Sequence, residues 1–212
     1  NWHGIDGLVE TLGKNGVTSN YRYDLAPYTW QLVSQMKRGK AIFTQPPMPI
    51  KCAGAPQKAM YLSADYWQKQ GVLKDIQVDF FNTGAVLFGV EAYVPALMEY
   101  VKRYHANLHF NHQLVKVDGA NKCAWFKVNQ GESTSLLETD FDMIHVVPPQ
   151  QAPDFIRASN LVDAAGWVSV DQNTLQHSKY PYIFALGDVM NAPNAKTAAA
   201  ARKQAPIVAV NV

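Results

Sequence analysis

The apolar positions in the first half of the chain alternate between a helical and an extended pattern. Apolar residues recur at three- and four-residue steps in three segments, 25–37, 56–70 and 90–104, which is the spacing of an amphipathic helix. Short apolar runs at 40–44 and 76–81 separate these segments and are typical of buried strands. Strands that alternate with helices predict βαβ units and therefore an α/β fold with a parallel sheet.

From residue 107 onward the pattern changes to short stretches of apolar and polar alternation. These stretches are 108–110, 113–117, 123–128 and 135–138. The turn signals Asp118-Gly119 and Asn129-Gln130-Gly131 lie between them, which predicts a meander of β-hairpins. The run 143–147 is then expected to be a buried strand, ended by two prolines.

Composition limits the class of protein. The chain has 212 residues, of which 48% are hydrophobic and 17% charged, as in ordinary globular proteins. Its formal net charge of +2 is too small to indicate a nucleic-acid partner. No apolar run approaches the roughly 18 residues of a membrane span. The histidines form no metal-ligand spacing, so no metal site is expected.

One of the two cysteines lies in an unusual setting. Cys52 stands between Lys51 and Lys58, directly before the predicted helix 56–70. Ammonium groups and a helix N-terminus stabilise a thiolate, which is the nucleophilic form of cysteine. Cys52 is therefore a candidate redox or nucleophilic residue, and a buried structural thiol is the alternative. The other cysteine, Cys123, falls in a predicted hairpin strand, and we expect it to be structural.

A second candidate motif lies near the other end of the chain. The run 182–186 is predicted to be a buried strand that ends at Gly187-Asp188, followed by a loop and a helix starting near Ala195. An Asp at the carboxyl end of a strand lies where open α/β sheets bind ligands, and its carboxylate accepts hydrogen bonds from hydroxyl groups. The helix N-terminus stabilises negative charge on a heterocycle. An ordinary strand-turn-helix with a capping Asp is the alternative.

Together these motifs resemble a known enzyme family. The segments KCAGAPQK (51–58), GDVMNAP (187–193), KTAAAA (196–201) and GLVETLGKNGVTSNY (7–21) are similar to sulfide:quinone oxidoreductase, a flavoprotein of the disulfide-reductase-like superfamily. The resemblance implies a Rossmann-like βαβ domain with a β-meander, flanked by parts of an FAD-binding Rossmann-type domain. It places 1–38 in the FAD-type domain, 39–149 in the second Rossmann-like domain and 150–212 in the FAD-type domain again. Because no G-x-G-x-x-G occurs, we expect an internal portion of a longer protein.

The resemblance also implies an activity and a set of site residues. Members of the family use FAD to oxidise sulfide, leaving a cysteine persulfide, and pass two electrons to a membrane quinone. Cys52 matches the sulfur on the flavin side, and its usual partner lies downstream of the segment that matches KTAAAA. Asp188 is expected to bind the ribityl chain. The helix start, Lys196, Thr197, Ala198 and Ala199, is expected to face the pyrimidine edge of the flavin.

Partners and location follow from the same resemblance. The expected partners are sulfide, a membrane quinone and a sulfur acceptor, either a thiol or a polysulfide, with no nucleic acid. The expected location is the surface of the bacterial or mitochondrial inner membrane. The resemblance implies a peripheral protein that docks through regions not contained in these 212 residues.

Two other functions remain open from the residues. The chain could belong to a related flavoprotein, either a sulfide dehydrogenase that donates to a cytochrome c or a type II NADH dehydrogenase. The loop 45–52 argues against NADH, because it carries prolines instead of the glycines that cradle a pyrophosphate. The chain could also be a non-catalytic α/β scaffold that keeps inherited motifs.

Overall fold

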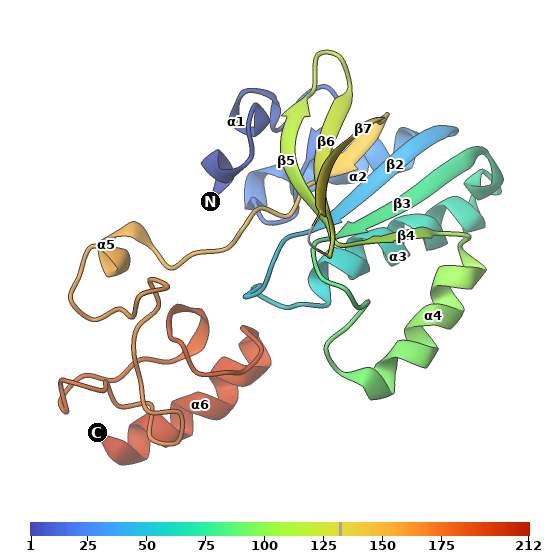
Figure 1. Ribbon diagram of the computed structural model, residues 1–212. Coiled ribbons are helices and arrows are strands. Elements are labelled where there is room, and N and C mark those ends of the chain that lie inside the picture. Colours follow the sequence, from blue (N-terminus) through green and yellow to red (C-terminus); the bar gives the residue numbers. More distant parts are fainter. Residues whose placement is uncertain (132) are drawn as a thin grey trace. The chain divides into compact units, whose positions relative to one another are not determined.

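The structure, a computed structural model, describes residues 1–131 and 133–212, which group into two compact units (Figure 1). The first unit consists of Asn1–Met48 and Gly54–Pro149. The second consists of Pro49–Ala53 and Gln150–Val212. The short stretch that carries Cys52 therefore groups with the last 63 residues of the chain rather than with its own sequence neighbours.

The first unit is built on a five-stranded parallel sheet with the strand order β1-β8-β2-β3-β4. Its strands are β1 (Val17–Thr18), β2 (Gly39–Gln45), β3 (Ile76–Asn82), β4 (Asn107–Phe110) and β8 (Met143–His145). Helix α3 (Ala55–Lys69) connects β2 to β3, and α4 (Val94–Arg103) connects β3 to β4. These two βαβ crossovers confirm the α/β fold that the alternating periodicity predicts.

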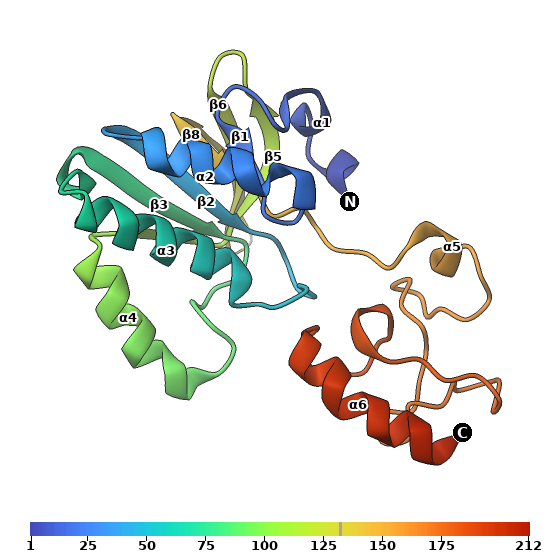
Figure 2. The same ribbon diagram turned by 180° about the vertical axis from the view of Figure 1, so that it is seen from behind.

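A second sheet of the same unit is antiparallel, with the order β5-β6-β7. Its strands are β5 (His112–Asp118), β6 (Cys123–Gln130) and β7 (Ser133–Asp140). Figures 1 and 2 show helices α2 (Ala26–Gln35) and α3 on one face of the parallel sheet and the antiparallel sheet on the other face. The unit thus has three layers, with the parallel sheet in the middle.

Each face of the middle sheet has its own apolar core. Phe43, Phe80 and Trp67 belong to the core on the helix side, where the Trp67 Nε1 donates a hydrogen bond to the Val33 carbonyl at 2.8 Å. Ile42 and its neighbours form the core on the side of the antiparallel sheet. Successive residues of β2 thus point to opposite faces, and both are fully buried, which explains the continuous apolar run in the sequence.

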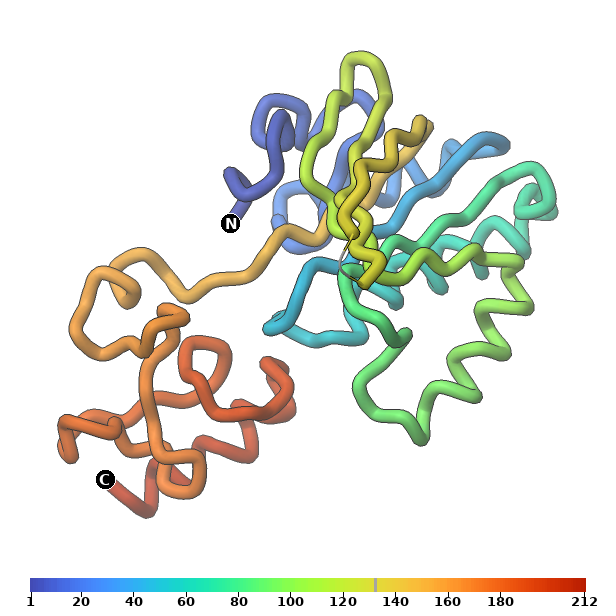
Figure 3. The backbone as a smooth tube through the Cα atoms, viewed as in Figure 1, coloured from blue at the N-terminus to red at the C-terminus, as the bar shows by residue number. Residues whose placement is uncertain are grey.

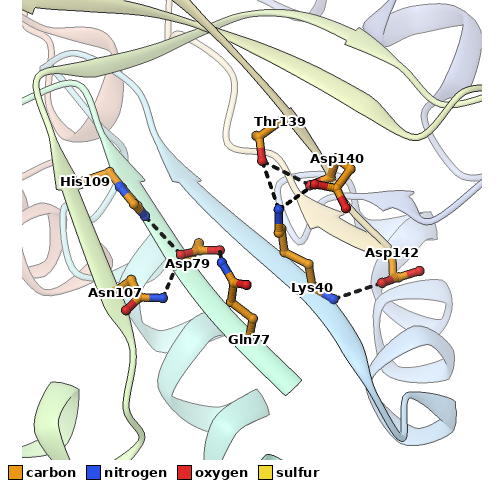
Figure 4. A network of polar contacts seen from close by, with 8 residues as sticks. All are labelled: Lys40, Gln77, Asp79, Asn107, His109, Thr139, Asp140 and Asp142. Atoms are coloured by element: carbon orange, nitrogen blue, oxygen red, sulfur yellow. Dashed lines mark hydrogen bonds and ion pairs between the residues drawn. The ribbon is translucent and has the colours of Figure 1, made fainter. Parts of the chain in front are cut away.

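A polar network around the buried Asp79 carboxylate joins β3 to the edge strand β4 (Figure 4). The Asp79 carboxylate, whose residue is 3% exposed, accepts hydrogen bonds from Gln77 Nε2 at 2.7 Å and Asn107 Nδ2 at 3.0 Å. The His109 Nε2 lies 3.0 Å from the same carboxylate. Burial raises the pKa of Asp79, but these hydrogen bonds outweigh it and hold the pKa below the usual value. Two side chains of β4, Asn107 and His109, thus contact the buried carboxylate on β3.

Some predicted elements differ from the structure. Residues 108–110 were expected in the hairpin meander, yet β4 pairs in parallel with β3, because the preceding helix α4 returns the chain to the same edge of the sheet. The segment 1–38, which the resemblance assigns to the FAD-type domain, contains β1, and β1 joins the first unit's sheet through β8. The 149/150 boundary coincides with the division between the units. Which segments belong to an FAD-type domain stays a prediction.

The second unit has little regular structure (Figure 3). It holds α5 (Asp154–Arg157), the 3₁₀ turn η5 (Gly187–Val189) and α6 (Ala198–Asn211). The strand expected at 182–186 is wrong: this segment makes one isolated bridge, Gln176 with Phe184, among the described residues. A strand needs a continuous partner, and the described residues supply none here. A small core containing Val168, Leu175 and Met190 holds the unit together.

Five short elements complete the part of the chain that the structure describes. They are α1 (Leu8–Thr11) and the 3₁₀ turns η1 (Trp2–Gly4), η2 (Tyr23–Leu25), η3 (Leu73–Asp75) and η4 (Glu91–Tyr93). The last of these occupies the start of the helix expected at 90–104, so the regular helix begins at Val94.

Candidate functional site

The two sequence motifs meet in the second unit. Lys51 and Lys196 pair as an isolated parallel bridge, which places the Cys52 loop beside the residues that lead into α6. Cys52 itself has a positive φ of 90°, a backbone conformation that residues other than glycine rarely adopt. Such strain persists only where the surroundings impose it, and it concentrates at functional sites.

Lys196 is a buried cation with two kinds of partner. The residue is 6% exposed, and its Nζ donates a hydrogen bond of 2.6 Å to the Met190 carbonyl. The same Nζ lies 4.0 Å from the centroid of the Trp167 ring, over the face of the indole. Burial lowers the pKa of Lys196; the nearby Lys51 also lowers it, while Asp188 and Asp163 partly oppose the shift.

Trp167 and Met190 are held together by the backbone around them. The Val168 N–H donates to the Val189 carbonyl at 3.0 Å, and the Asn191 N–H donates to the Val168 carbonyl at 3.0 Å. These bonds flank a parallel bridge between Val168 and Met190. The ring and the carbonyl that contact Lys196 therefore belong to one hydrogen-bonded pair of segments.

Asp163 anchors the other side of this arrangement. Its Oδ1 accepts from the Trp167 N–H at 3.1 Å and the Ala165 N–H at 2.9 Å, and its Oδ2 accepts from Asn191 Nδ2 at 3.0 Å. Burial raises the pKa of Asp163, but the hydrogen bonds, led by that of Trp167, leave the pKa below its usual value. The carboxylate thus stays ionised and ties both segments to one point.

The start of α6 presents backbone donors to solvent. Thr197 is the N-cap, and its side chain accepts from the Ala200 N–H at 3.0 Å. The first turn of a helix leaves N–H groups without intrahelical partners, and here they belong to the exposed Ala198 and Ala199. The sequence placed the helix start near Ala195; the structure begins α6 three residues later.

The Gly187-Asp188 turn is attached to the same helix. The Gly187 N–H donates to Gln204 Oε1 at 2.7 Å, and Gly187 has a φ of 73°. Asp188 follows, half-buried, and its charge acts on Lys196. The predicted site residues Cys52, Asp188, Lys196, Thr197, Ala198 and Ala199 all lie in this unit.

Sequence reasoning missed Trp167, Met190, Asp163 and Gln204. A single tryptophan in an apolar run carries no spacing signal, and a backbone carbonyl has none at all. Asp163 could have been found, because an Asp a few residues before a Gly is typical of a turn. Cys123 lies on β6 in the first unit, where burial and the neighbouring Glu138 raise the pKa of its thiol.

Two kinds of site are absent from the part of the chain that the structure describes. No group of three or more His, Cys, Asp or Glu side chains is arranged to hold a metal ion. Within those same residues, no helix combines the length and the apolar character that a membrane crossing requires.

The chain is similar in sequence to curated proteins over nearly all of its length. It is 45% identical to a mitochondrial sulfide:quinone oxidoreductase of Dictyostelium discoideum over 213 aligned positions, covering 100% of the chain and 46% of that protein. It is 39% identical to the mouse mitochondrial sulfide:quinone oxidoreductase, covering 96% of the chain and 45% of that protein. The chain thus spans about half the length of the curated relatives it matches. No protein-family model matches it.

Solved structures share the fold. A chain in the mitochondrial ATP synthase of Tetrahymena thermophila superposes with a TM-score of 0.75 at 21% identity, over 98% of this chain and 52% of that one. The sulfide:quinone oxidoreductase of Aquifex aeolicus superposes with a TM-score of 0.71 at 16% identity, over 92% of this chain and 46% of that one. At these identities the likeness concerns the fold.

Proposed function

The chain belongs to the sulfide:quinone oxidoreductase family, and from this premise we propose that the protein containing it oxidises sulfide and passes two electrons to a quinone. The observation that carries the proposal is the pairing of Lys51 with Lys196, which brings the Cys52 loop to the start of α6. A reactive sulfur and a group of hydrogen-bond donors for an electron acceptor are then neighbours within one unit.

The proposed sulfur chemistry needs a second cysteine from the rest of the protein. Sulfide attacks one sulfur of a disulfide between that cysteine and Cys52. A new sulfur–sulfur bond forms, giving a persulfide on the second cysteine. The disulfide bond breaks, and Cys52 leaves as a thiolate that carries the electron pair. Lys51, the preceding residue in the chain, would supply a positive charge that stabilises this thiolate near the start of α6.

The residues beside Cys52 fit a flavin, and we assign FAD as the cofactor. Bound FAD would supply the two-electron acceptor between the thiolate and the quinone. Asp188 offers carboxylate oxygens to the ribityl hydroxyls. The N–H groups of Ala198 and Ala199 point from a helix N-terminus, which favours negative charge. Lys196 adds a fixed positive charge, and Thr197 keeps the helix start in place.

Partners and location extend the same proposal. The sulfur leaves the persulfide by attack of an acceptor thiol or polysulfide, and the quinone takes up the two electrons with two protons to become a quinol. Because the similar curated proteins are named as mitochondrial, we assign the protein to the mitochondrial inner membrane, as a peripheral protein.

The test uses the full-length protein in stopped-flow absorbance. Cys52→Ser should abolish the bleaching of the flavin by sulfide, because a hydroxyl of similar size cannot form or release a sulfur–sulfur bond. Cys123→Ser is the matched control and should bleach at the parent rate, since Cys123 lies on a sheet of the first unit. A Cys52→Ser protein that bleaches as fast as the parent contradicts the assignment. A purified protein that holds no flavin, even after FAD is added, contradicts the function itself.

A further inference from the structure

Lys196 raises a question that the proposed function leaves open, namely what keeps its side chain in one place. A lysine side chain has four flexible bonds and normally extends into water. Here it is almost fully buried beside an exposed helix start, and among the residues that the structure describes its Nζ donates one hydrogen bond, to the Met190 carbonyl. One neutral carbonyl is a weak restraint on an ammonium group that has three N–H donors.

The second restraint is the Trp167 ring. The Nζ stands 4.0 Å from the ring centroid, well inside the roughly 6 Å within which an indole face attracts a cation. Tryptophan gives the strongest attraction of the aromatic side chains, and the attraction increases when water is excluded. Trp167 is itself 6% exposed, so its indole face is shielded from solvent.

Trp167 can act as a restraint because its own position is fixed. The backbone N–H of Trp167 donates to Asp163 Oδ1, and the backbone carbonyl of Trp167 accepts from the Asp163 N–H at 2.8 Å. The next residue, Val168, is bonded on both sides to the segment that contains Met190. The backbone that carries the ring is therefore held on both sides and the residue is buried, which are the properties a positioning residue needs.

We propose that Trp167 is a positioning residue, whose indole face and the Met190 carbonyl together hold the Lys196 ammonium at the start of α6, toward the pyrimidine edge of the flavin. The inference rests on the proposed function. A cation fixed there stabilises the negative charge that reduction places on the pyrimidine. A mobile lysine would instead be hydrated, and its charge would interact only weakly with the flavin. Trp167 thus acts on electron transfer through Lys196 without touching the cofactor or the sulfur.

The first measurement does not depend on the flavin. In the full-length protein, the acylation rate of Lys196 by acetic anhydride is followed by mass spectrometry. Trp167→Leu should raise this rate about fivefold, the factor that corresponds to about 1 kcal/mol of cation–π attraction. Trp167→Phe, which keeps a ring, should give a smaller increase, and it keeps the test decisive if the leucine variant does not fold.

The second measurement is the two-electron midpoint potential of the bound flavin. Trp167→Leu should make reduction about tenfold less favourable, which is a fall of about 30 mV for a two-electron couple. Lys196→Met should lower the potential at least as far. The double variant should fall no further than Lys196→Met alone, because the two residues act through one cation.

The matched control is Trp125→Leu. Trp125 also carries a lysine over its ring, with Lys116 Nζ 4.6 Å from the centroid, but it lies on β6 in the first unit. This variant should change neither the acylation of Lys196 nor the midpoint potential. The inference is overturned if the leucine variants of Trp167 and Trp125 behave alike, or if the double variant shows additive falls. A protein without flavin contradicts the proposed function, and the acylation rates then decide the role of Trp167 alone.

Discussion

At the scale of single residues, the two cysteines differ in what surrounds them. Burial and the carboxylates of Glu138, Asp118 and Asp140 raise the pKa of the Cys123 thiol, so little of it is ionised near neutral pH. Cys52 lies in a strained loop next to Lys51 and beside Lys196. The thiolate is the reactive form, so the two thiols should be distinguishable by their rates of reaction.

We therefore expect Cys52 to react with iodoacetamide faster than Cys123 near pH 7. The measurement is competitive alkylation of the reduced full-length protein, with each site quantified by mass spectrometry. The difference should narrow as the pH rises, because the Cys123 thiol then ionises. Faster labelling of Cys123 at pH 7 would contradict the assignment of Cys52 as the reactive residue.

Asp188 gives a second prediction at this scale. Asp188→Ala should release flavin more readily, because the ribityl hydroxyls lose a charged acceptor worth roughly 1.5–3 kcal/mol per hydrogen bond. Flavin content after gel filtration measures the effect. Asp188→Asn, which keeps one acceptor oxygen, should retain more flavin than Asp188→Ala. Equal flavin content in the parent and the alanine variant would count against the site.

At the scale of elements, helices and central strands were predictable and edge elements were not. The periodicity at 56–70 corresponds to α3 within one residue at each end, and the apolar run at 76–81 corresponds to β3. These segments carry a strong pattern because both are buried against the same core. The partner of β4 and the lack of a partner for 182–186 depend on distant residues, which local patterns do not report.

The Asp79 network is expected to hold the edge strand β4 in place. Asp79→Ala removes the buried carboxylate that accepts hydrogen bonds from the exposed Gln77 and Asn107 side chains, whose donors can then turn to water, and should cost about 2 kcal/mol of unfolding free energy in urea. Asp24→Ala, which removes an exposed ion pair with Arg22, should leave stability unchanged. Equal midpoints for the two variants would show that the network is dispensable.

The same carboxylate predicts a pH dependence. Because the pKa of Asp79 is lowered in the folded state, its contribution is fully present above the unfolded value of about 3.9 and is lost as the pH falls through the folded value. The stability difference between the parent and Asp79→Ala should therefore be constant near neutral pH and shrink in acid. Urea titrations at several pH values between neutral and strongly acidic conditions check this.

Alanine substitutions at two glycines, Gly16 and Gly131, test how closely the residue before β8 approaches the turn before β1. Gly16 has a φ of 84°, and an added Cβ would stand 2.3 Å from the Asp142 carbonyl oxygen. Gly131 has a φ of 63° and nothing within 4 Å of such a Cβ. Gly131→Ala should cost about 1 kcal/mol for its backbone conformation alone, and Gly16→Ala clearly more. Thermal unfolding that gives equal costs would contradict the packing described for this turn.

At the scale of the whole molecule, the first unit keeps the βαβ frame of a nucleotide-binding domain without the loop that binds a pyrophosphate. Strand β2 ends at Gln45, and Pro46 and Pro47 follow where a glycine-rich loop would stand. The sequence predicts this frame well, because the periodicity of each element and the prolines of the loop can be read from the segment itself, without knowing its distant contacts. The grouping of residues 49–53 with 150–212 has no local signal, since it depends on pairing across the chain.

We therefore expect neither NADH nor NADPH to reduce the protein. The absorbance of the flavin in the full-length protein should stay unchanged when either nucleotide is mixed in at sub-millimolar concentration. Sulfide added to the same sample serves as the positive control and should bleach it. Rapid bleaching by NADH would show that a proline-rich loop can still bind the pyrophosphate.

The composition of the second unit has a consequence for biosynthesis. The stretch Pro49–Ala53 leaves the ribosome long before the residues that pack beside it, since Lys196 follows Cys52 by about 140 residues. At the usual rates of elongation this is a delay of roughly 7–30 s. During that interval the first unit can begin to fold, but the residues that surround the Cys52 thiol in the second unit have not yet been synthesised. If the protein binds FAD as proposed, the residues assigned to the flavin can assemble only after most of the chain has been synthesised, and the Cys52 thiol is exposed to oxidation until then.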